Sequence, residues 1–205
     1  MEHGVTLIYD GSFNGFLCAV YKAYESKLFV TGILKEDQYQ EDMFSNAIVT
    51  KTELNKAKRV WYKLQDKHYE ALKNIYFAFL SETPGIEIRL YRQIVRRLGR
   101  LPITSDDDVQ NGFNYLEGIV SRVSREKRKW EASINLNFAQ GKPAIVRIRP
   151  KYNILPLISR FFRLTHHSNP WIIFDQQRNY GIYFDGDVTQ MVTEIPRQFN
   201  WVDAA

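Results

Sequence analysis

The sequence predicts an α+β fold, in which a central helical segment is inserted between an N-terminal strand and a C-terminal, mostly antiparallel sheet region. A β-branched and aromatic run at 5–10 ends at an Asp-Gly pair. Apolar residues then recur at helical spacing through about 51–130, and short strand-like runs follow residue 131. We expect a single domain over 1–205, with an α/β frame of 1–50 and 131–205, whose N-terminal strand and C-terminal sheet could pair with each other.

The N-terminal part begins with "VTLIYD" at 5–10, which has the composition of a strand. Ser12 or Asn14 can then cap a helix that runs to about Glu25, because both side chains accept hydrogen bonds from amides of a first helical turn. Residues 26–50 carry no clear periodicity, so irregular structure or short β pieces are expected there.

The central part shows helical periodicity from Thr52 to Phe79, with a break near Asp66 that predicts two helices in a hairpin. "IRLYRQIVRRLG" predicts a further helix that ends near Gly99, since glycine is preferred just past a helix end. Ser105 and the three aspartates after it predict the start of a last helix, which closes with the basic segment "SREKRKW".

The C-terminal part alternates strand-like and helical runs. "SINLNF" and "AIVRIRP" predict strands on either side of Gly141, and "ILPLISRFFRL" predicts a helix. "WIIFD" and "YGIYFDG" predict a hairpin around 176–179.

Composition excludes several classes of protein. With 44% hydrophobic residues and no apolar run of 18, we expect a cytoplasmic, soluble chain without a membrane segment. The single cysteine, Cys18, excludes an internal disulfide, a four-thiolate zinc site and an iron–sulfur cluster held by this chain alone. Adjacent histidines at 166 and 167 project in different directions and make a poor metal pair. We expect no metal and no cofactor.

The turn that begins at Asp10 has several interpretations. A Walker loop is excluded, because the glycines at 11 and 15 are too close and Phe16 stands where the lysine is required. "IYDG" at 8–11 is echoed by "YFDG" at 183–186, so Asp10 and Asp185 could meet to bind Mg²⁺ or share a proton. Asp-Gly is also a common turn dipeptide, and a purely structural corner is the alternative.

Charge is distributed unevenly along the chain. Residues 1–50 carry three Lys against seven acids (−4), residues 51–130 carry 17 basic against ten acidic residues (+7), and residues 131–205 carry eight against six (+2). This asymmetry favours a face that binds a polyanion, although cationic faces can also be simply solvated. The candidate nucleic-acid-binding residues form three groups: Lys56, Arg59, Lys63 and Lys67; Arg122, Arg125, Arg128 and Lys129; Arg147 and Arg149.

Several separated motifs, in the same order, resemble those of a known family: "LIYDGSFNGFLCAVYKAYE", "RVWYKL…IYFAFLSETPGIE", "VSREKRKW" and "YNILPLISRFF…PWIIFDQQRNYGIYFDG". The chain resembles a bacterial family described as "probable DNA metabolism protein". Members are found beside a radical SAM protein assigned to DNA repair, or fused to a uracil-DNA glycosylase-like domain. This chain departs from the pattern at Arg128 and Phe161, where the family usually has His, so chemistry that uses those imidazoles would be absent here.

The resemblance implies a role in DNA metabolism and a partner protein rather than a defined reaction. The first hypothesis is a DNA-binding accessory protein that presents nucleic acid to a radical SAM or glycosylase-like partner. The second is an enzyme that acts directly on DNA or nucleotides through Asp10 and Asp185. The third is a protein-interaction adaptor without DNA contact.

Overall fold

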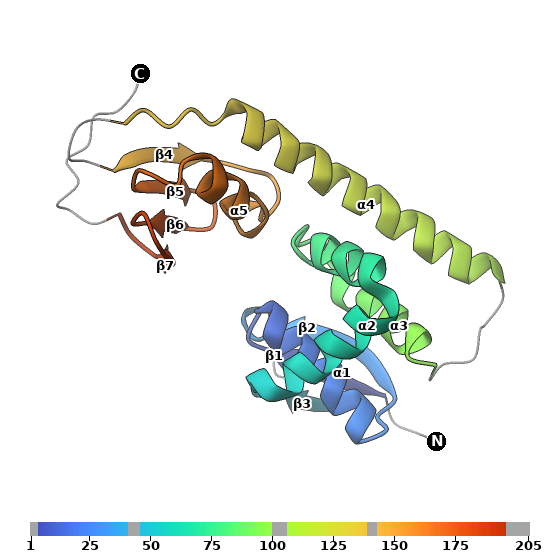
Figure 1. Ribbon diagram of the computed structural model, residues 1–205. Coiled ribbons are helices and arrows are strands. Elements are labelled where there is room, and N and C mark those ends of the chain that lie inside the picture. The colour runs from blue at the N-terminus through green and yellow to red at the C-terminus, as the bar shows by residue number, and fades with distance from the viewer. Residues whose placement is uncertain (1–3, 41–45, 100–105, 139–142, 196–205) are drawn as a thin grey trace. The chain divides into compact units, whose positions relative to one another are not determined.

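A computed structural model describes residues 4–40, 46–99, 106–138 and 143–195 (Figure 1). The fold combines helices with a parallel N-terminal sheet and a mixed C-terminal sheet, which confirms the predicted fold class. The chain forms two compact units, Met1–Val120 and Ser121–Ala205. The prediction of a single domain over 1–205 stays a prediction.

Unit 1 is built on a three-stranded sheet in the order β2-β1-β3, from β1 (Val5–Tyr9), β2 (Val30–Lys35) and β3 (Ala47–Val49). A short 3-10 helix, η1 (Glu36–Gln38), follows β2. Both neighbours of β1 run parallel to it. The expectation that this N-terminal strand pairs with the C-terminal sheet is therefore wrong, because β2 and β3 already occupy both of its edges. Strands β2 and β3 both belong to residues 26–50, where the sequence shows little periodicity.

Helix α1 (Phe13–Glu25) follows β1 as predicted, and Ser12 is its N-cap. The Ser12 hydroxyl accepts a hydrogen bond from the Gly15 amide at 2.9 Å. The buried face of α1 joins an aromatic cluster in which the rings of Phe16 and Phe79 are 5.6 Å apart and those of Tyr9 and Phe16 are 6.2 Å apart. The strand, the first helix and the next helix thus share one core.

Helix α2 (Leu54–Phe79) has non-helical backbone angles at His68 (φ −149°, ψ 52°), and its two halves run in different directions (Figure 1). The break predicted near Asp66 is therefore a one-residue kink rather than the loop of a hairpin. Helix α3 (Ile86–Arg97) ends just before Gly99, whose φ of 74° is the left-handed conformation expected past a helix end. Buried Glu87 of α3 accepts a hydrogen bond from the Tyr9 hydroxyl at 3.1 Å.

Helix α4 (Asp106–Ser133) contains the boundary between the two units. Its buried side includes Leu116, Ile119 and Val123, and Val120 is half-buried. The predicted cap Ser105 and the side chains of Val109 and Phe113 lie outside the described part of the chain.

Unit 2 holds a four-stranded sheet in the order β4-β5-β6-β7. Strand β4 (Ala144–Ile148) is parallel to β5 (Trp171–Asp175), and α5 (Leu155–Thr165) connects them. Strands β6 (Tyr180–Phe184) and β7 (Thr189–Val192) add antiparallel pairs. The core consists of apolar side chains from α5 and the central strands: Ile158, Phe162, Trp171, Ile172 and Phe184.

Two predictions for unit 2 need correction. Residues 134–138 of "SINLNF" do not form a strand, and β4 pairs with β5 instead. Apolar and polar residues alternate in this segment as they do in a strand. Of residues 134–138, however, Leu136 alone is buried, at 6% exposure, and the segment pairs with no strand. Strand β7 was not predicted, because its mostly exposed residues do not alternate between apolar and polar in the way that indicates a strand. In the described ranges, no helix has the length and apolar character needed to cross a membrane.

Candidate nucleic-acid interface

The first predicted cationic group lies on the N-terminal half of α2, where it contacts tyrosines of α1. The Lys56 ammonium and the Arg59 guanidinium each lie 5.9 Å from the Tyr21 ring centre, and Lys63 lies 5.6 Å from that of Tyr24. Arg59 also donates a hydrogen bond to the Tyr21 hydroxyl at 3.0 Å. The side chain of Lys67, the fourth member of this group, lies outside the described part.

The second group lies on α4 within unit 2. All four side chains are exposed: Arg122, Arg125, Arg128 and Lys129. At about 100° per residue, Arg125 and Arg128 lie roughly opposite to buried Ile119 and Val123, and Arg122 and Lys129 lie between these two sides. This half of α4 therefore presents its cations to solvent and its apolar side chains to the core.

The third group lies at the end of β4, also within unit 2. Arg147 and Arg149 are exposed and line an open hollow of about 510 Å³ together with Gln176 and Asn179. The Arg149 side chain donates a hydrogen bond to the Gln176 amide oxygen at 3.0 Å. A guanidinium held in this way is partly ordered before a ligand arrives, which reduces the entropy lost on binding.

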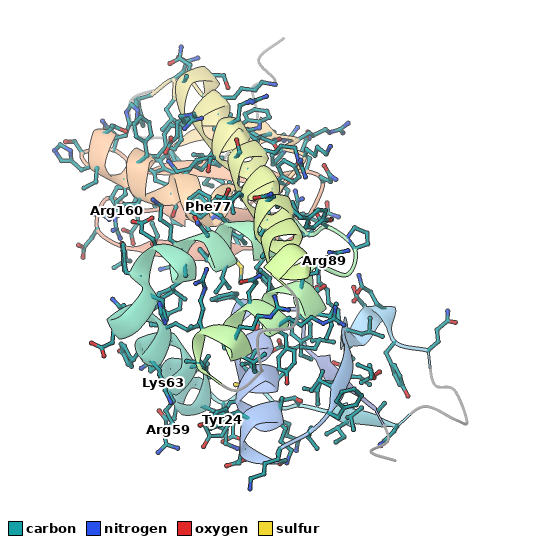
Figure 2. All side chains as sticks on the ribbon, turned by 90° about the vertical axis from the view of Figure 1, so that its right-hand side faces the viewer. Tyr24, Arg59, Lys63, Phe77, Arg89 and Arg160 are labelled. Carbon is teal, nitrogen blue, oxygen red and sulfur yellow. The ribbon has the colours of Figure 1, made fainter. Side chains whose placement is uncertain are left out.

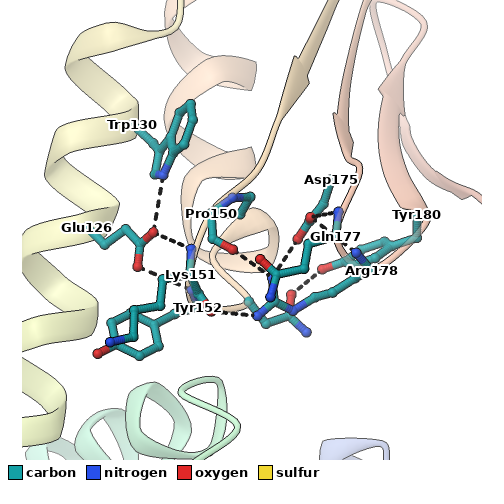
Figure 3. A network of polar contacts seen from close by, with 10 residues as sticks. Glu126, Trp130, Pro150, Lys151, Tyr152, Asp175, Gln177, Arg178 and Tyr180 are labelled. Atoms are coloured by element: carbon teal, nitrogen blue, oxygen red, sulfur yellow. Dashed lines mark hydrogen bonds and ion pairs between the residues drawn. The ribbon is translucent and has the colours of Figure 1, made fainter.

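Glu126 connects α4 to the loop that follows β4 (Figure 3). Its carboxylate accepts hydrogen bonds from the backbone amides of Lys151 at 2.5 Å and Tyr152 at 3.2 Å, and from the Trp130 indole at 3.4 Å. In this loop, Lys151 lies two residues after Arg149. The structure thus brings the second and third cationic groups into one unit and links them through a single acidic side chain.

Arg178 holds the same loop from the other side (Figure 3). Its guanidinium donates to the carbonyl oxygens of Pro150 at 3.1 Å and Lys151 at 3.0 Å, and it forms an ion pair with Asp175 at 2.9 Å. The Asp175 side chain is fully buried, and it also accepts from the Gln177 amide at 2.8 Å. The Tyr180 hydroxyl completes the network with a hydrogen bond to Asn153.

Sequence reasoning did not identify Glu126, Lys151 and Arg178 as parts of this region. Glu126 carries a recognisable signal, because it is the only acid in "SREKRKW" and lies at helical spacing from buried Val123 and from Trp130. A carboxylate on the inward face of a helix needs a partner there. Arg178 carries no comparable signal, since two of its three oxygen partners are carbonyls of a loop about 27 residues earlier and the third is Asp175 in its own turn.

Asp10, the first of the two candidate catalytic carboxylates, is engaged at the end of β1. It accepts hydrogen bonds from the Ser12 amide at 2.9 Å, the Ser12 hydroxyl at 2.7 Å and the Thr52 hydroxyl at 2.7 Å. Gly11 has a φ of 80°, so the turn requires its left-handed backbone. Asp10 and Gly11 also border an open hollow of about 520 Å³. The Thr52 contact joins this turn to the segment after β3.

Asp185, the second candidate, lies in the turn between β6 and β7. It accepts hydrogen bonds from the amides of Asp187 and Val188, both at 2.8 Å, and these bonds lower its pKa. Asp10 and Asp185 lie in different units, and each carboxylate stabilises its own turn. Within the described ranges, no three His, Cys, Asp or Glu side chains are grouped so that they could hold a metal ion.

The hydrogen bonds to Asp10 predict a pH-dependent contribution to stability. Partial burial alone would raise its pKa, but the hydrogen bonds from Ser12 and Thr52 outweigh burial and lower the pKa below 3.8. A lowered pKa in the folded state means that this contribution is complete above the unfolded pKa and disappears as the pH falls through the folded one. Asp10→Asn should cost about 1 kcal/mol at pH 7.

Urea denaturation of the wild-type chain and of Asp10→Asn from pH 7 to pH 2.5 measures this effect. The difference between their free energies of unfolding should shrink below about pH 4. Asp187→Asn serves as the matched control, because the Asp187 side chain lies in an exposed turn. A difference that is constant over the whole pH range would contradict an ionised, hydrogen-bonded Asp10.

Comparison with known proteins identifies one family. A family model described as a domain of unknown function, DUF4130, matches residues 84–202. This segment includes α3, α4 and all of the described strands of unit 2, and hence the second and third cationic groups. The α2 group lies outside it. No protein with a curated description matches the chain.

Proposed function

Since this chain belongs to the DUF4130 family, a domain of unknown function, we propose its function from its own surface: it is a DNA-binding accessory protein in DNA repair or DNA metabolism. The observation that carries the proposal is the charge of unit 2. Residues 121–205 contain 13 Lys and Arg against seven Asp and Glu, a net charge of +6, whereas residues 1–120 contain 15 against 16. The polyanion-binding surface is therefore assigned to unit 2.

The arrangement of these charges supports contact with phosphates. The exposed side of α4 presents Arg122, Arg125, Arg128 and Lys129 within two helical turns. Guanidinium groups bind phosphate oxygens through two parallel hydrogen bonds, and each contact releases counterions from DNA. Contacts to phosphates carry no information on base identity, so sequence-independent binding is the expected mode.

The hydrogen bonds of Glu126 and Arg178 support the same proposal. They fix both sides of the loop at 150–153, which carries exposed Lys151 close to the end of β4. Cations on a fixed loop lose less entropy on binding than cations on a flexible one. The loop and the α4 face would together follow a phosphate backbone.

The proposed partner is a radical SAM protein of DNA repair or a uracil-DNA glycosylase-like protein, and the proposed compartment is the cytoplasm. This part rests on the family resemblance of motifs that include "SREKRKW" and "DQQRNYG". Five of their side chains, Glu126, Trp130, Asp175, Arg178 and Tyr180, belong to the network around the 150–153 loop. An accessory role is supported over a direct reaction because each of the two candidate carboxylates, Asp10 and Asp185, accepts hydrogen bonds within its own turn.

Binding of the full chain to a 20-base-pair duplex at 50 mM and 200 mM salt tests the proposal. We expect affinity to fall by at least tenfold between the two concentrations, because displacement of several counterions gives a slope of about −0.9 per phosphate contact. Two unrelated duplex sequences should give the same slope. Absence of duplex binding at 50 mM salt, with and without the partner, would refute DNA binding and favour a protein adaptor.

A further inference from the structure

We propose that the open hollow at the end of β4 receives one unpaired nucleotide of a DNA strand, with the base against the Phe174 ring and the phosphate on Arg149. This inference rests on the proposed DNA-binding function and names the form of DNA that unit 2 selects. The hollow measures about 510 Å³, and its lining residues all belong to unit 2. Pockets for small molecules measure about 300–1,000 Å³, so the hollow has the size of a site for a single nucleotide.

The sheet of unit 2 places the ring and the cations on the same face. Arg147 of β4 and Phe174 of β5 are register partners. The pairing continues past both strands, because the Gln176 amide donates a hydrogen bond to the Ile148 carbonyl oxygen at 2.9 Å. Side chains alternate along paired strands, so Arg149 and Gln176 continue the face of Arg147 and Phe174. All four side chains therefore border one hollow.

Helix α5 covers the opposite face of this sheet. The ring of Phe162 on α5 lies 6.2 Å from that of Trp171 on β5, and both side chains are buried. Trp171 and Phe174 are three residues apart on one strand, so their side chains point to opposite faces. Phe174 is half-buried and Arg147 is exposed. The face that carries the hollow is thus distinct from the face that forms the core with α5.

The position of the Phe174 ring depends on a glycine. A Cβ atom at Gly181 of β6 would lie 2.8 Å from Cδ2 of Phe174 and 2.9 Å from the Ile173 carbonyl oxygen, so the ring packs against bare backbone there. In the described part of the chain, no other ring and no cation stacks on Phe174. The ring is therefore held in place on β6 and borders the hollow, where a base of any sequence can stack on it.

The polar groups of the hollow match the rest of a nucleotide. Arg149 donates through Nε to the Gln176 amide oxygen at 3.0 Å, and its two terminal nitrogens, which have no partner among the described residues, can donate to two phosphate oxygens. The same bond leaves the Gln176 NH₂ group as a donor, and the Asn179 amide lies beside it in the lining. Amides of this kind pair with the acceptor atoms of base edges.

The charge of the hollow favours one phosphate over several. Its lining contains two arginines and one acid, Glu194, which gives a net charge of +1. A phosphodiester within a DNA strand carries a single negative charge, whereas the polyphosphate of a free nucleotide carries several. The base can enter the hollow only after it leaves the stack of the duplex, so the nucleotide must be unpaired.

Three labelled duplexes of 20 base pairs test this inference with the full chain. The first is fully paired, the second has one extra thymidine in the middle of one strand, and the third has an abasic residue in place of that thymidine. We expect wild type to bind the duplex with the extra thymidine roughly tenfold more tightly than the paired duplex, because one base stacks on Phe174. The abasic duplex should bind like the paired one, since it offers no base.

Matched variants assign this preference to the hollow. Phe174→Leu should remove the preference for the extra thymidine, because leucine keeps an apolar contact but has no ring. Phe161→Leu is its control, since exposed Phe161 belongs to α5. Arg149→Gln should reduce the preference severalfold, whereas Arg160→Gln, an equal change in charge at an exposed residue of α5 (Figure 2), should leave it unchanged. Melting temperatures verify that each variant is folded.

The paired duplex separates this inference from the proposed function. Phe174→Leu should bind the paired duplex within about twofold of wild type, because stacking is not available there. If wild type binds all three duplexes equally, or if folded Phe174→Leu and Arg149→Gln both keep the preference, the nucleotide site is refuted and the proposed function stands. Displacement of the duplex with the extra thymidine by micromolar thymidine monophosphate would assign the hollow to a free nucleotide and also overturn the inference. If wild type binds none of the duplexes, both proposals fail.

Discussion

Replacing Arg178 with Ala is expected to lower the free energy of unfolding of unit 2 by about 3–5 kcal/mol, because removal of one partner leaves a buried charge uncompensated. The Asp175 side chain is fully buried and that of Arg178 is 12% exposed, so little water can replace the guanidinium. The substitution also removes the hydrogen bonds to Pro150 and Lys151. Urea denaturation followed by tryptophan fluorescence measures the loss, since three of the four tryptophans, Trp130, Trp171 and Trp201, belong to residues 121–205.

Two further variants distinguish loss of the ion pair from loss of packing. The double variant Arg178→Ala, Asp175→Asn should be less destabilised than the sum of the single changes, because a neutral Asn does not need the cation. Arg178→Lys should be intermediate, since one ammonium cannot reproduce the forked geometry that reaches two carbonyls and a carboxylate. A cost below about 1 kcal/mol for Arg178→Ala would show that the network contributes little to stability.

Neutralising the exposed face of α4 is expected to weaken duplex DNA binding by roughly two orders of magnitude at low salt, with a salt dependence flatter by up to about 3–4 log–log units. The variant carries Gln at Arg122, Arg125, Arg128 and Lys129. These side chains point away from the core, so the melting temperature should remain close to wild type. Titration of a labelled duplex at four salt concentrations gives both the affinity and the slope.

A control variant with the same change in net charge shows whether position matters. It carries Gln at four exposed cations of unit 1 that lie outside the three cationic groups: Lys27, Lys51, Lys73 and Arg92. It should lose much less affinity, because none of these cations belongs to the proposed interface on α4 and salt weakens any attraction that does not involve direct contact. Equal losses in the two variants would assign binding to net charge alone and contradict an interface on α4.

Local features of the fold were predictable from the sequence. The strand before Asp10, the cap at Ser12, the end of α3 near Gly99 and the hairpin of β5 and β6 all occur where they were predicted. Each depends on residues that are near neighbours in the chain, such as a hydroxyl beside a first helical turn or a glycine after a last one. The exposed cations of α4 were predictable for the same reason, since helical spacing alone separates them from the buried stripe.

Contacts between distant segments were decided only by the tertiary structure. The sequence determined that Asp10 lies at a strand end, but the hydrogen bond from Thr52, 42 residues later, shows that this carboxylate joins two loops of unit 1. It likewise determined a basic segment around Glu126, whereas the amides of Lys151 and Tyr152, about 25 residues away, give that acid its role. The pairing of β1 with β2 and β3 is likewise a contact between segments that are distant in the sequence. Periodicity and capping act over a few residues, while the partner of a strand edge or of a buried carboxylate is selected by packing of the whole unit, and the sequence pattern around either residue does not contain that information.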